Sequence, residues 1–172
     1  CEGAIMVALA TALSYVKLFE LPQGGSVCIG MLPIFLYCIR WGWKDGFLAS
    51  FAYGLLQLIF DGAYAWGPWS MLLDYLVAFM ALGTAEFFAR PFKNRMVGVA
   101  VGTFMAGFLR FMCSFLSGVL VWGNLNEGLS AWTYSLVYNA SYMLPETLIT
   151  VVGAVLLIRV APQIFDRQYA KA

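Results

Sequence analysis

Residues 96–122, MVGVAVGTFMAGFLRFMCSFLSGVLVW, decide the fold class of this chain. The stretch is almost wholly apolar and contains one charged residue, Arg110. About 20 consecutive apolar residues are enough for a helix to cross the hydrocarbon core of a bilayer. Residues 96–122 therefore predict a transmembrane helix with one cationic side chain inside the membrane.

Five other apolar runs have the same character, and charged residues, glycine and proline separate them. The six predicted spans cover residues 3–19, 27–41, 45–61, 69–89, 96–122 and 132–160. Hydrophobic residues make up 62% of the sequence and charged residues 11%, whereas soluble domains average about 25% charged residues. The sequence predicts an all-α integral membrane protein, in which residues 1–172 form a single membrane domain of six transmembrane helices.

The distribution of lysine and arginine predicts how these helices are oriented. Six crossings place both termini on one side of the membrane. The basic residues at helix ends or tails on that side are Arg40, Lys44, Arg90, Lys93, Arg95, Arg159, Arg167 and Lys171. Lys17 lies near a helix end on the opposite side. Because cytoplasmic loops are enriched in lysine and arginine, we predict that both termini are cytoplasmic.

Composition disfavours several classes of function. A net charge of +1 provides no basic surface for nucleic acid. The sequence has no histidine, and its four cysteines have no C-x-x-C spacing, so we expect neither a metal site nor a bound cofactor. Because the spans offer no plausible general base or metal set, we expect that the protein is not an enzyme.

Three ionisable residues lie deep within the predicted spans: Asp74, Arg110 and Glu146. At about 1.5 Å of rise per residue, Arg110 and Glu146 both lie roughly 20 Å from the outer ends of their helices. This matching depth predicts an ion pair between the fifth and sixth spans. Asp74 lies roughly 8 Å deep, in the outer half of the membrane. A charge inside the membrane is by default a functional-site hypothesis.

Polar and aromatic residues recur at helical spacing on three spans, so each set faces one side of its helix. The sets are Tyr53, Gln57 and Tyr64; Arg110, Ser114, Gly118 and Trp122; and Ser135, Asn139, Tyr142 and Glu146. Such stripes can simply hold helices together, with Gly118 allowing close packing. That alternative does not account for Asp74. We interpret Asp74 and the aromatic residues predicted near it as a cage for an organic cation. Those aromatic residues are Tyr64, Tyr75, Trp122 and Tyr134.

Small residues repeat every four positions along the first span, at Ala4, Ala8 and Ala12. This spacing lets another helix approach closely. Simple packing within the chain is the alternative reading, because alanine is common in membrane helices.

Several of these stretches resemble one known family. They are LPQGGSV (21–27), MLPI (31–34), YGLLQL (53–58), LLDYLVAF (72–79), FLRFMCSFLSGVLVWG (108–123) and WTYSLVYNASYMLPE (132–146). In this order they resemble the thiamine-specific S components, the substrate-binding subunits of energy-coupling factor (ECF) transporters. The resemblance runs from about residue 2 to residue 160, and the last three stretches are the most specific.

The resemblance implies a multi-pass protein of a prokaryotic plasma membrane that captures thiamine from outside. It also implies docking on a separate module of one transmembrane subunit and two ATPases. The sequence contains no G-x-x-x-x-G-K-[ST] pattern, as expected for a subunit that does not hydrolyse ATP. An S component for a related pyrimidine or thiamine analogue is the nearest alternative. A self-sufficient small transporter or channel is the alternative from a different class.

Carried over by position, the resemblance implies a set of ligand-binding residues and a docking stripe. The binding residues are Asp74, Tyr75, Tyr64, Gly118, Trp122, Tyr134 and Asn139, and the docking residues are Ala4 and Ala8. The family usually has histidine where this chain has Ser114, and we include Ser114 in the candidate site. Gln23, Gly24 and Gly25 form the predicted lid, because glycine permits the backbone change that closure requires.

Overall fold

A computed structural model describes residues 1–21, 24–61, 67–122 and 130–165 of the chain, without the side chain of Trp122. Tyr64 and Gln23, which the sequence places in the candidate site and its lid, lie outside these ranges. The α-helices are α1 (Glu2–Ser14), α2 (Met31–Trp41), α3 (Trp43–Asp61), α4 (Gly67–Ser70), α5 (Ala78–Met80), α6 (Ala85–Ala89), α7 (Arg95–Ser117) and α8 (Ala131–Val160). Two strands, β1 (Phe19–Glu20) and β2 (Ser26–Val27), and four other helical turns complete the described chain.

Some helices join end to end, and each continuous helical segment is a rod of the bundle. The fourth rod, after α1, α2 and α3, runs from Gly67 to Ala89 and changes its helical type along its length. It passes from α4 through the π-helix η2 (Met71–Val77), α5 and the 3₁₀-helix η3 (Ala81–Thr84) into α6. In the fifth rod, the π-helix η4 (Gly118–Trp122) extends α7. A last 3₁₀ turn, η6 (Pro162–Phe165), follows α8.

Among the described residues, three helical segments are long and apolar enough to cross a membrane: Gly67–Ala89, Arg95–Val121 and Ala131–Val160. The helices α1 and α2 are apolar but shorter. Many large apolar side chains are exposed on the outside of the bundle, among them Leu48, Ile59, Phe87 and Val160. In a bilayer such side chains face lipid, because lipid tails are as apolar as leucine. The all-helical, membrane-embedded character predicted from the sequence agrees with this structure.

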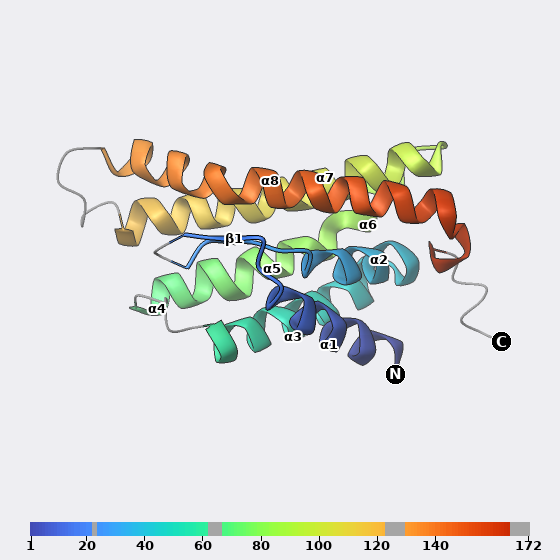
Figure 1. Cartoon of the computed structure of the whole chain (residues 1–172), viewed down its shortest axis with the longest axis horizontal. Helices are drawn as coiled ribbons and strands as arrows, with labels where there is room; N and C mark the ends of the chain where they lie inside the picture. Colours follow the sequence, from blue (N-terminus) through green and yellow to red (C-terminus); the bar gives the residue numbers. More distant parts are fainter. Residues whose placement is uncertain (22–23, 62–66, 123–129, 166–172) are drawn as a thin grey trace.

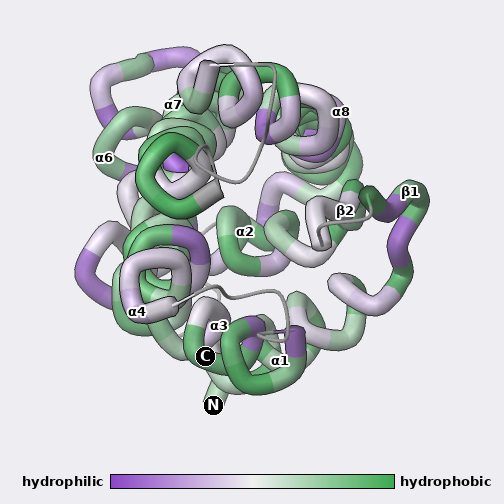
Figure 2. The backbone as a smooth tube through the Cα atoms, turned by 90° about the vertical axis from the view of Figure 1, so that its left-hand side faces the viewer, coloured by the Kyte–Doolittle hydropathy of each residue, from purple (hydrophilic) through white to green (hydrophobic). Residues whose placement is uncertain are grey.

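Helix α2 forms the centre of the bundle, and the other helices surround it (Figures 1 and 2). Ile34, Phe35 and Cys38 on this helix are completely buried. The apolar face of a helix packs toward the core of a structure. Gly42, with φ of +96°, ends α2 and lets the chain reverse into α3, a backbone conformation that suits glycine.

The segment between the first two helices differs from the sequence prediction. We expected helices over 3–19 and 27–41, but α1 ends at Ser14 and α2 begins only at Met31. Between them β1 and β2 form an antiparallel hairpin, in which Phe19 pairs with Val27. Gly24, with φ of +90°, occupies the turn. The predicted end of the first helix and start of the second were wrong here, because hydropathy does not distinguish an apolar strand from the end of an apolar helix.

Both ends of the described chain lie at the same end of the bundle (Figure 1). Arg40, near the end of α2, forms an ion pair of 3.0 Å with Glu2 and donates a 2.9 Å hydrogen bond to the carbonyl of Ile164. Arg95, at the start of α7, donates a 2.6 Å hydrogen bond to the carbonyl of Phe165. The basic residues of this end therefore hold the first and last helices against the core.

Candidate ligand-binding site

A polar cavity of about 120 Å³ lies in the half of the bundle remote from these ends. A single water needs only about 10–15 Å³ of such space, so the cavity can take a small organic molecule. Five helical segments, α1, α3, Gly67–Ala89, α7 with η4, and α8, contribute its walls together with the hairpin. The lining residues are Ser14, Gly24, Gly25, Ser26, Cys28, Tyr53, Gln57, Asp61, Ser70, Asp74, Tyr75, Phe79, Arg110, Ser114, Gly118, Tyr134, Ser135, Tyr138, Asn139, Tyr142 and Glu146.

Asp74 provides a carboxylate in the wall of this cavity. Its Oδ2 accepts hydrogen bonds from Ser70 Oγ at 2.8 Å and from Ser117 Oγ at 2.6 Å. Hydrogen bonds to a carboxylate are stronger than those between neutral groups. They offset part of the cost of taking the carboxylate out of water.

The backbone around Asp74 is π-helical. Asp74 and Tyr75 lie within η2, and Gly118 begins the second π-helix, η4. Such turns are rare and occur frequently at functional sites. Asp74 and Tyr75 of η2 and Gly118 of η4 line the same cavity.

Three tyrosines of α8 form an aromatic wall of the cavity. The rings of Tyr134 and Tyr138 stack with centroids 5.9 Å apart, and Tyr138 meets Tyr142 edge-on at 5.7 Å. The spacing of four residues places all three on one helical face. Aromatic faces attract organic cations, because the ring quadrupole is negative above the ring.

Asn139 and Gly118 bring α8 and α7 together beside this wall. Asn139 Nδ2 donates to the carbonyl of Ser135 at 2.9 Å, and Asn139 Oδ1 accepts from the Tyr142 hydroxyl at 3.0 Å. A Cβ atom at Gly118 would overlap the Ser135 side chain. Gly118 therefore permits close packing of the helices, and Asn139 keeps one acceptor lone pair for a further partner.

The predicted ion pair between Arg110 and Glu146 is confirmed, at 2.7 Å between Nη1 and Oε2. Only 12% of the Arg110 side chain and 2% of the Glu146 side chain are exposed. Cys28 Sγ donates to Glu146 Oε1 at 3.2 Å, and the Arg110 guanidinium lies 4.7 Å from the centre of the Phe79 ring. Both members of the pair also line the cavity, which the sequence reading did not anticipate.

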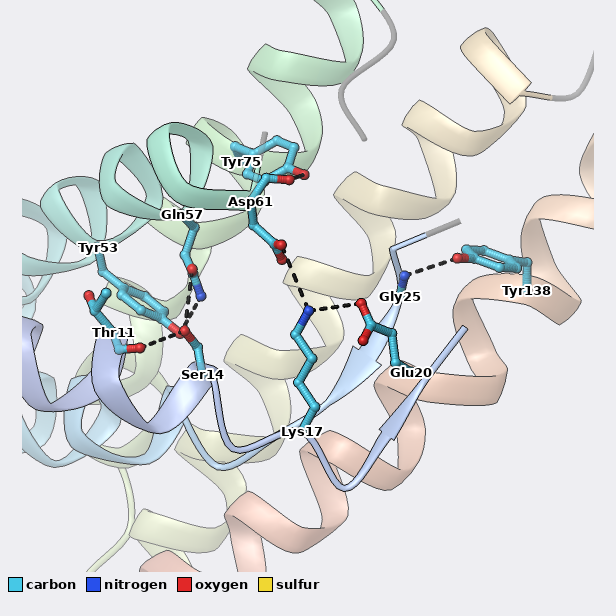
Figure 3. Close-up of polar contacts among 10 residues, drawn as sticks. All are labelled: Thr11, Ser14, Lys17, Glu20, Gly25, Tyr53, Gln57, Asp61, Tyr75 and Tyr138. Carbon is cyan, nitrogen blue, oxygen red and sulfur yellow. Dashed lines mark hydrogen bonds and ion pairs between the residues drawn. The ribbon is translucent and has the colours of Figure 1, made fainter. Parts of the chain in front are cut away.

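The β1–β2 hairpin lies against α8 at one side of the cavity (Figure 3). The backbone N–H of Gly25 donates to the Tyr138 hydroxyl at 3.0 Å. Lys17 lies between Glu20 and Asp61, with its ammonium 2.9 Å from the first carboxylate and 3.8 Å from the second (Figure 3). These contacts connect the hairpin to α8 and to the end of α3.

A polar chain joins α1 to the same cavity through α3 (Figure 3). Ser14 Oγ lies 3.4 Å from Gln57 Oε1, and Gln57 Nε2 donates to the Tyr53 hydroxyl at 2.8 Å. The sequence placed Gln57 and Tyr53 on a polar stripe that could merely hold helices together. The structure shows that both also face the cavity.

The structure brings most of the predicted site together. Residues Asp74, Tyr75, Ser114, Gly118, Tyr134 and Asn139 all line the cavity. Trp122 ends η4, but its side chain lies outside the described part of the structure. Ala4 and Ala8 are exposed on α1, away from the cavity. Within the described ranges, no group of three Cys, Asp or Glu residues is placed to hold a metal ion.

Sequence reasoning missed several contributors. Asp61, at the end of the third predicted span, was not included in the candidate site, yet it lines the cavity as a further carboxylate. Ser70, Tyr138 and Phe79 were not singled out, although Ser70 and Tyr138 each lie four residues from a predicted site residue. Helical spacing could have found those two.

Comparisons with known proteins agree with this fold. The family model for thiamine transporter protein (Thia_YuaJ) matches residues 1–166. The thiamine transporter ThiT of Bacillus subtilis is 37% identical over 98% of this chain and 94% of its own length. The ThiT of Lacticaseibacillus paracasei is 29% identical over 99% of this chain and 92% of its own length.

Two solved structures are similar in three dimensions. ThiT from Listeria monocytogenes has a TM-score of 0.84 and 26% identity, with 95% of this chain and 94% of that chain covered. The S component of a bacterial ECF transporter has a TM-score of 0.65 over 96% of both chains, at 14% identity, and shows a shared fold alone. The family model spans nearly the whole chain, so this protein belongs to the thiamine transporter protein family.

Proposed function

We propose that this protein is the thiamine-binding S component of an ECF transporter, and that it captures the vitamin from outside the cell without catalysing a reaction. The observation that carries the proposal is the Asp74 carboxylate, which shares one cavity with the tyrosine wall of α8. Thiamine has a cationic thiazolium ring and an aminopyrimidine ring. A half-buried carboxylate and aromatic faces are complementary to a flat organic cation.

In this proposal Asp74 meets the positive charge or the exocyclic amine of thiamine. Tyr75 and Tyr134 supply aromatic and hydroxyl contacts, while Ser114 and Asn139 meet polar edges. Family resemblance adds Tyr64 and Trp122, with Trp122 stacking on one ring. Gly118 lets α7 and α8 pack closely, so that Ser135 and Asn139 lie beside it in the cavity wall.

The bundle has six membrane crossings in this proposal, and its basic end faces the cytoplasm. Arg40, Arg90 and Arg95 lie at helix ends on the side where the two ends of the described chain meet. Lysine and arginine are enriched on cytoplasmic sides. The cavity then lies in the outer half, where the β1–β2 hairpin acts as its lid.

Docking uses the exposed stripe of Ala4 and Ala8 on α1. Small residues let a helix of the transmembrane coupling subunit approach the backbone closely. The ATPases of that module supply the energy for uptake. Two features support this role for α1: its alanines face outward, while Ser14 at its end faces the cavity.

Equilibrium binding of thiamine to the purified full chain, without partners, tests the proposal. Calorimetry should show one saturable site for thiamine and much weaker binding of its isolated pyrimidine half. If the pyrimidine compound binds more tightly than thiamine, then thiamine is not the ligand of this protein. Equilibration of thiamine across liposomes that contain only this chain would instead indicate a self-sufficient transporter.

A further inference from the structure

The Asp74 carboxylate is held by two serine hydroxyls that come from different rods of the bundle. Ser70 Oγ donates at 2.8 Å and Ser117 Oγ at 2.6 Å, and both share the oxygen Oδ2. Ser70 is 2% exposed and Ser117 is completely buried. Hydrogen bonds of this charge-assisted kind are roughly twice as strong as neutral ones. Oδ2 is therefore fixed from two sides.

Both serines lie where an α-helix changes into a π-helix. Ser70 is the last residue of α4 and directly precedes η2, and Ser117 is the last residue of α7 and directly precedes η4. A π-helical turn redirects the side chains that follow it, and such turns occur frequently at functional sites. Asp74 thus connects the two junctions to each other.

We propose that Ser70 and Ser117 are positioning residues, which hold Oδ2 so that the other carboxylate oxygen, Oδ1, meets the cation of the ligand. This inference rests on the proposed function, in which Asp74 is the counter-charge of bound thiamine. A carboxylate that rotates freely must lose that freedom on binding, and this loss weakens affinity. The hydrogen bonds from the two serines fix the orientation of the Asp74 carboxylate before the ligand binds.

A purely structural role for the serines has different consequences. Serine hydroxyls often hold membrane helices together. In that case their removal would lower thermal stability, and any effect on affinity would not depend on whether Asp74 is present. A double-mutant cycle separates the two roles, because it measures coupling between two side chains.

The test is calorimetric titration of thiamine into purified Ser117→Ala and Ser70→Ala variants of the full chain. Loss of one hydrogen bond to a charged group should weaken binding about tenfold. Ser50→Ala is the matched control, since Ser50 is completely buried and outside the cavity, and its affinity should match the parent. In an Asp74→Ala background, Ser117→Ala should weaken binding less than about twofold.

An equal loss in both backgrounds would overturn the inference, and so would parental affinity in both serine variants. If Ser117→Ala does not yield folded protein, the Ser70→Ala cycle carries the same test. Failure of the proposed function would look different, because Asp74→Ala would then leave thiamine affinity unchanged. If Asp74→Ala weakens thiamine binding while the serine variants do not, the proposed function stands and only this inference is wrong.

Discussion

At the scale of single residues, two carboxylates in the cavity wall have different partners. Glu146 is neutralised by Arg110 across 2.7 Å. Asp74 receives serine hydroxyls instead, and within the described part of the chain no ion pair joins it to a cation. The first pair suits a structural role. The negative charge of Asp74 remains available to a ligand.

Replacing Asp74 by asparagine removes that charge and keeps the shape of the side chain. Asp74→Asn should weaken thiamine binding by about 2–5 kcal/mol, the range for removing one member of a buried charge pair. Ser114→Ala should cost only about 1 kcal/mol, as for a neutral hydrogen bond. Calorimetry of both variants measures the difference. Parental affinity in Asp74→Asn would move the cation site elsewhere.

Glu146→Gln breaks the pair with Arg110 and leaves a buried cation behind. Breaking a buried pair from one side typically costs about 3–5 kcal/mol of stability. We expect a large fall in the thermal unfolding midpoint and a smaller change in thiamine affinity. Glu20→Gln is the matched control, because its more exposed pair with Lys17 is worth about 0–1 kcal/mol. A larger effect on affinity than on stability would make Glu146 a ligand contact.

At the scale of elements, the hairpin and α1 have different roles in the proposed mechanism. The hairpin packs inward, where Gly25 touches the tyrosine face of α8. Helix α1 turns Ala4 and Ala8 outward. In the proposed function, the hairpin controls access of the ligand, and α1 offers a surface to a partner.

Gly25→Ala should disturb the closed hairpin. A Cβ atom at this position would lie 2.7 Å from Tyr142 Cδ1 and 3.0 Å from the Tyr138 hydroxyl, so the hairpin must move away. We expect at least about tenfold weaker thiamine binding, mostly through faster dissociation, measured by stopped-flow tryptophan fluorescence. Gly153→Ala is the control, since its Cβ would meet only flexible Leu32 methyl groups at 3.3 Å or more. An unchanged dissociation rate in Gly25→Ala would argue against the lid.

Ala8→Phe should separate binding from transport. A bulky side chain on the exposed stripe prevents close approach of a partner helix, while the cavity is untouched. Uptake of thiamine by cells should be abolished at normal expression, and the purified variant should bind thiamine like the parent. Ala4→Phe should behave alike. Ser141→Phe, at an exposed position on α8, should leave uptake intact. Normal uptake in the Ala8 variant would place the docking surface elsewhere.

At the scale of the whole molecule, the two ends of the bundle differ in chemistry. One end gathers arginines and both ends of the described chain. The other holds the polar cavity under the hairpin. Between the two ends lies α2, whose Ile34, Phe35 and Cys38 side chains are completely buried. This apolar middle supports a binding subunit rather than a continuous polar channel.

Cysteine labelling of intact cells tests the orientation of these ends. In a background with all four native cysteines replaced by alanine, Glu20→Cys on the hairpin should react with a membrane-impermeant maleimide. Lys93→Cys at the basic end should react only after permeabilisation, because arginine and lysine favour the cytoplasmic side. The reverse pattern would invert the topology and place the cavity inside the cell.

The sequence by itself determined the membrane class, the helical rods and the depth of the buried charges. Backbone groups in lipid must bond internally, so long apolar runs leave few options other than helices. Depth follows from counting residues along a helix, which is why the pair of Arg110 and Glu146 could be predicted. Most of the candidate site was also predictable, because family resemblance and helical spacing both point to Asp74, Asn139 and their neighbours.

Only the tertiary structure decided the hairpin, the two π-helical segments and the convergence of Ser70 and Ser117 on Asp74. It also placed Tyr138 and Arg110 in the cavity wall. These features depend on how far each helix is rotated and shifted against its neighbours. Packing of side chains between helices sets those quantities, and a residue pattern along one helix does not contain them.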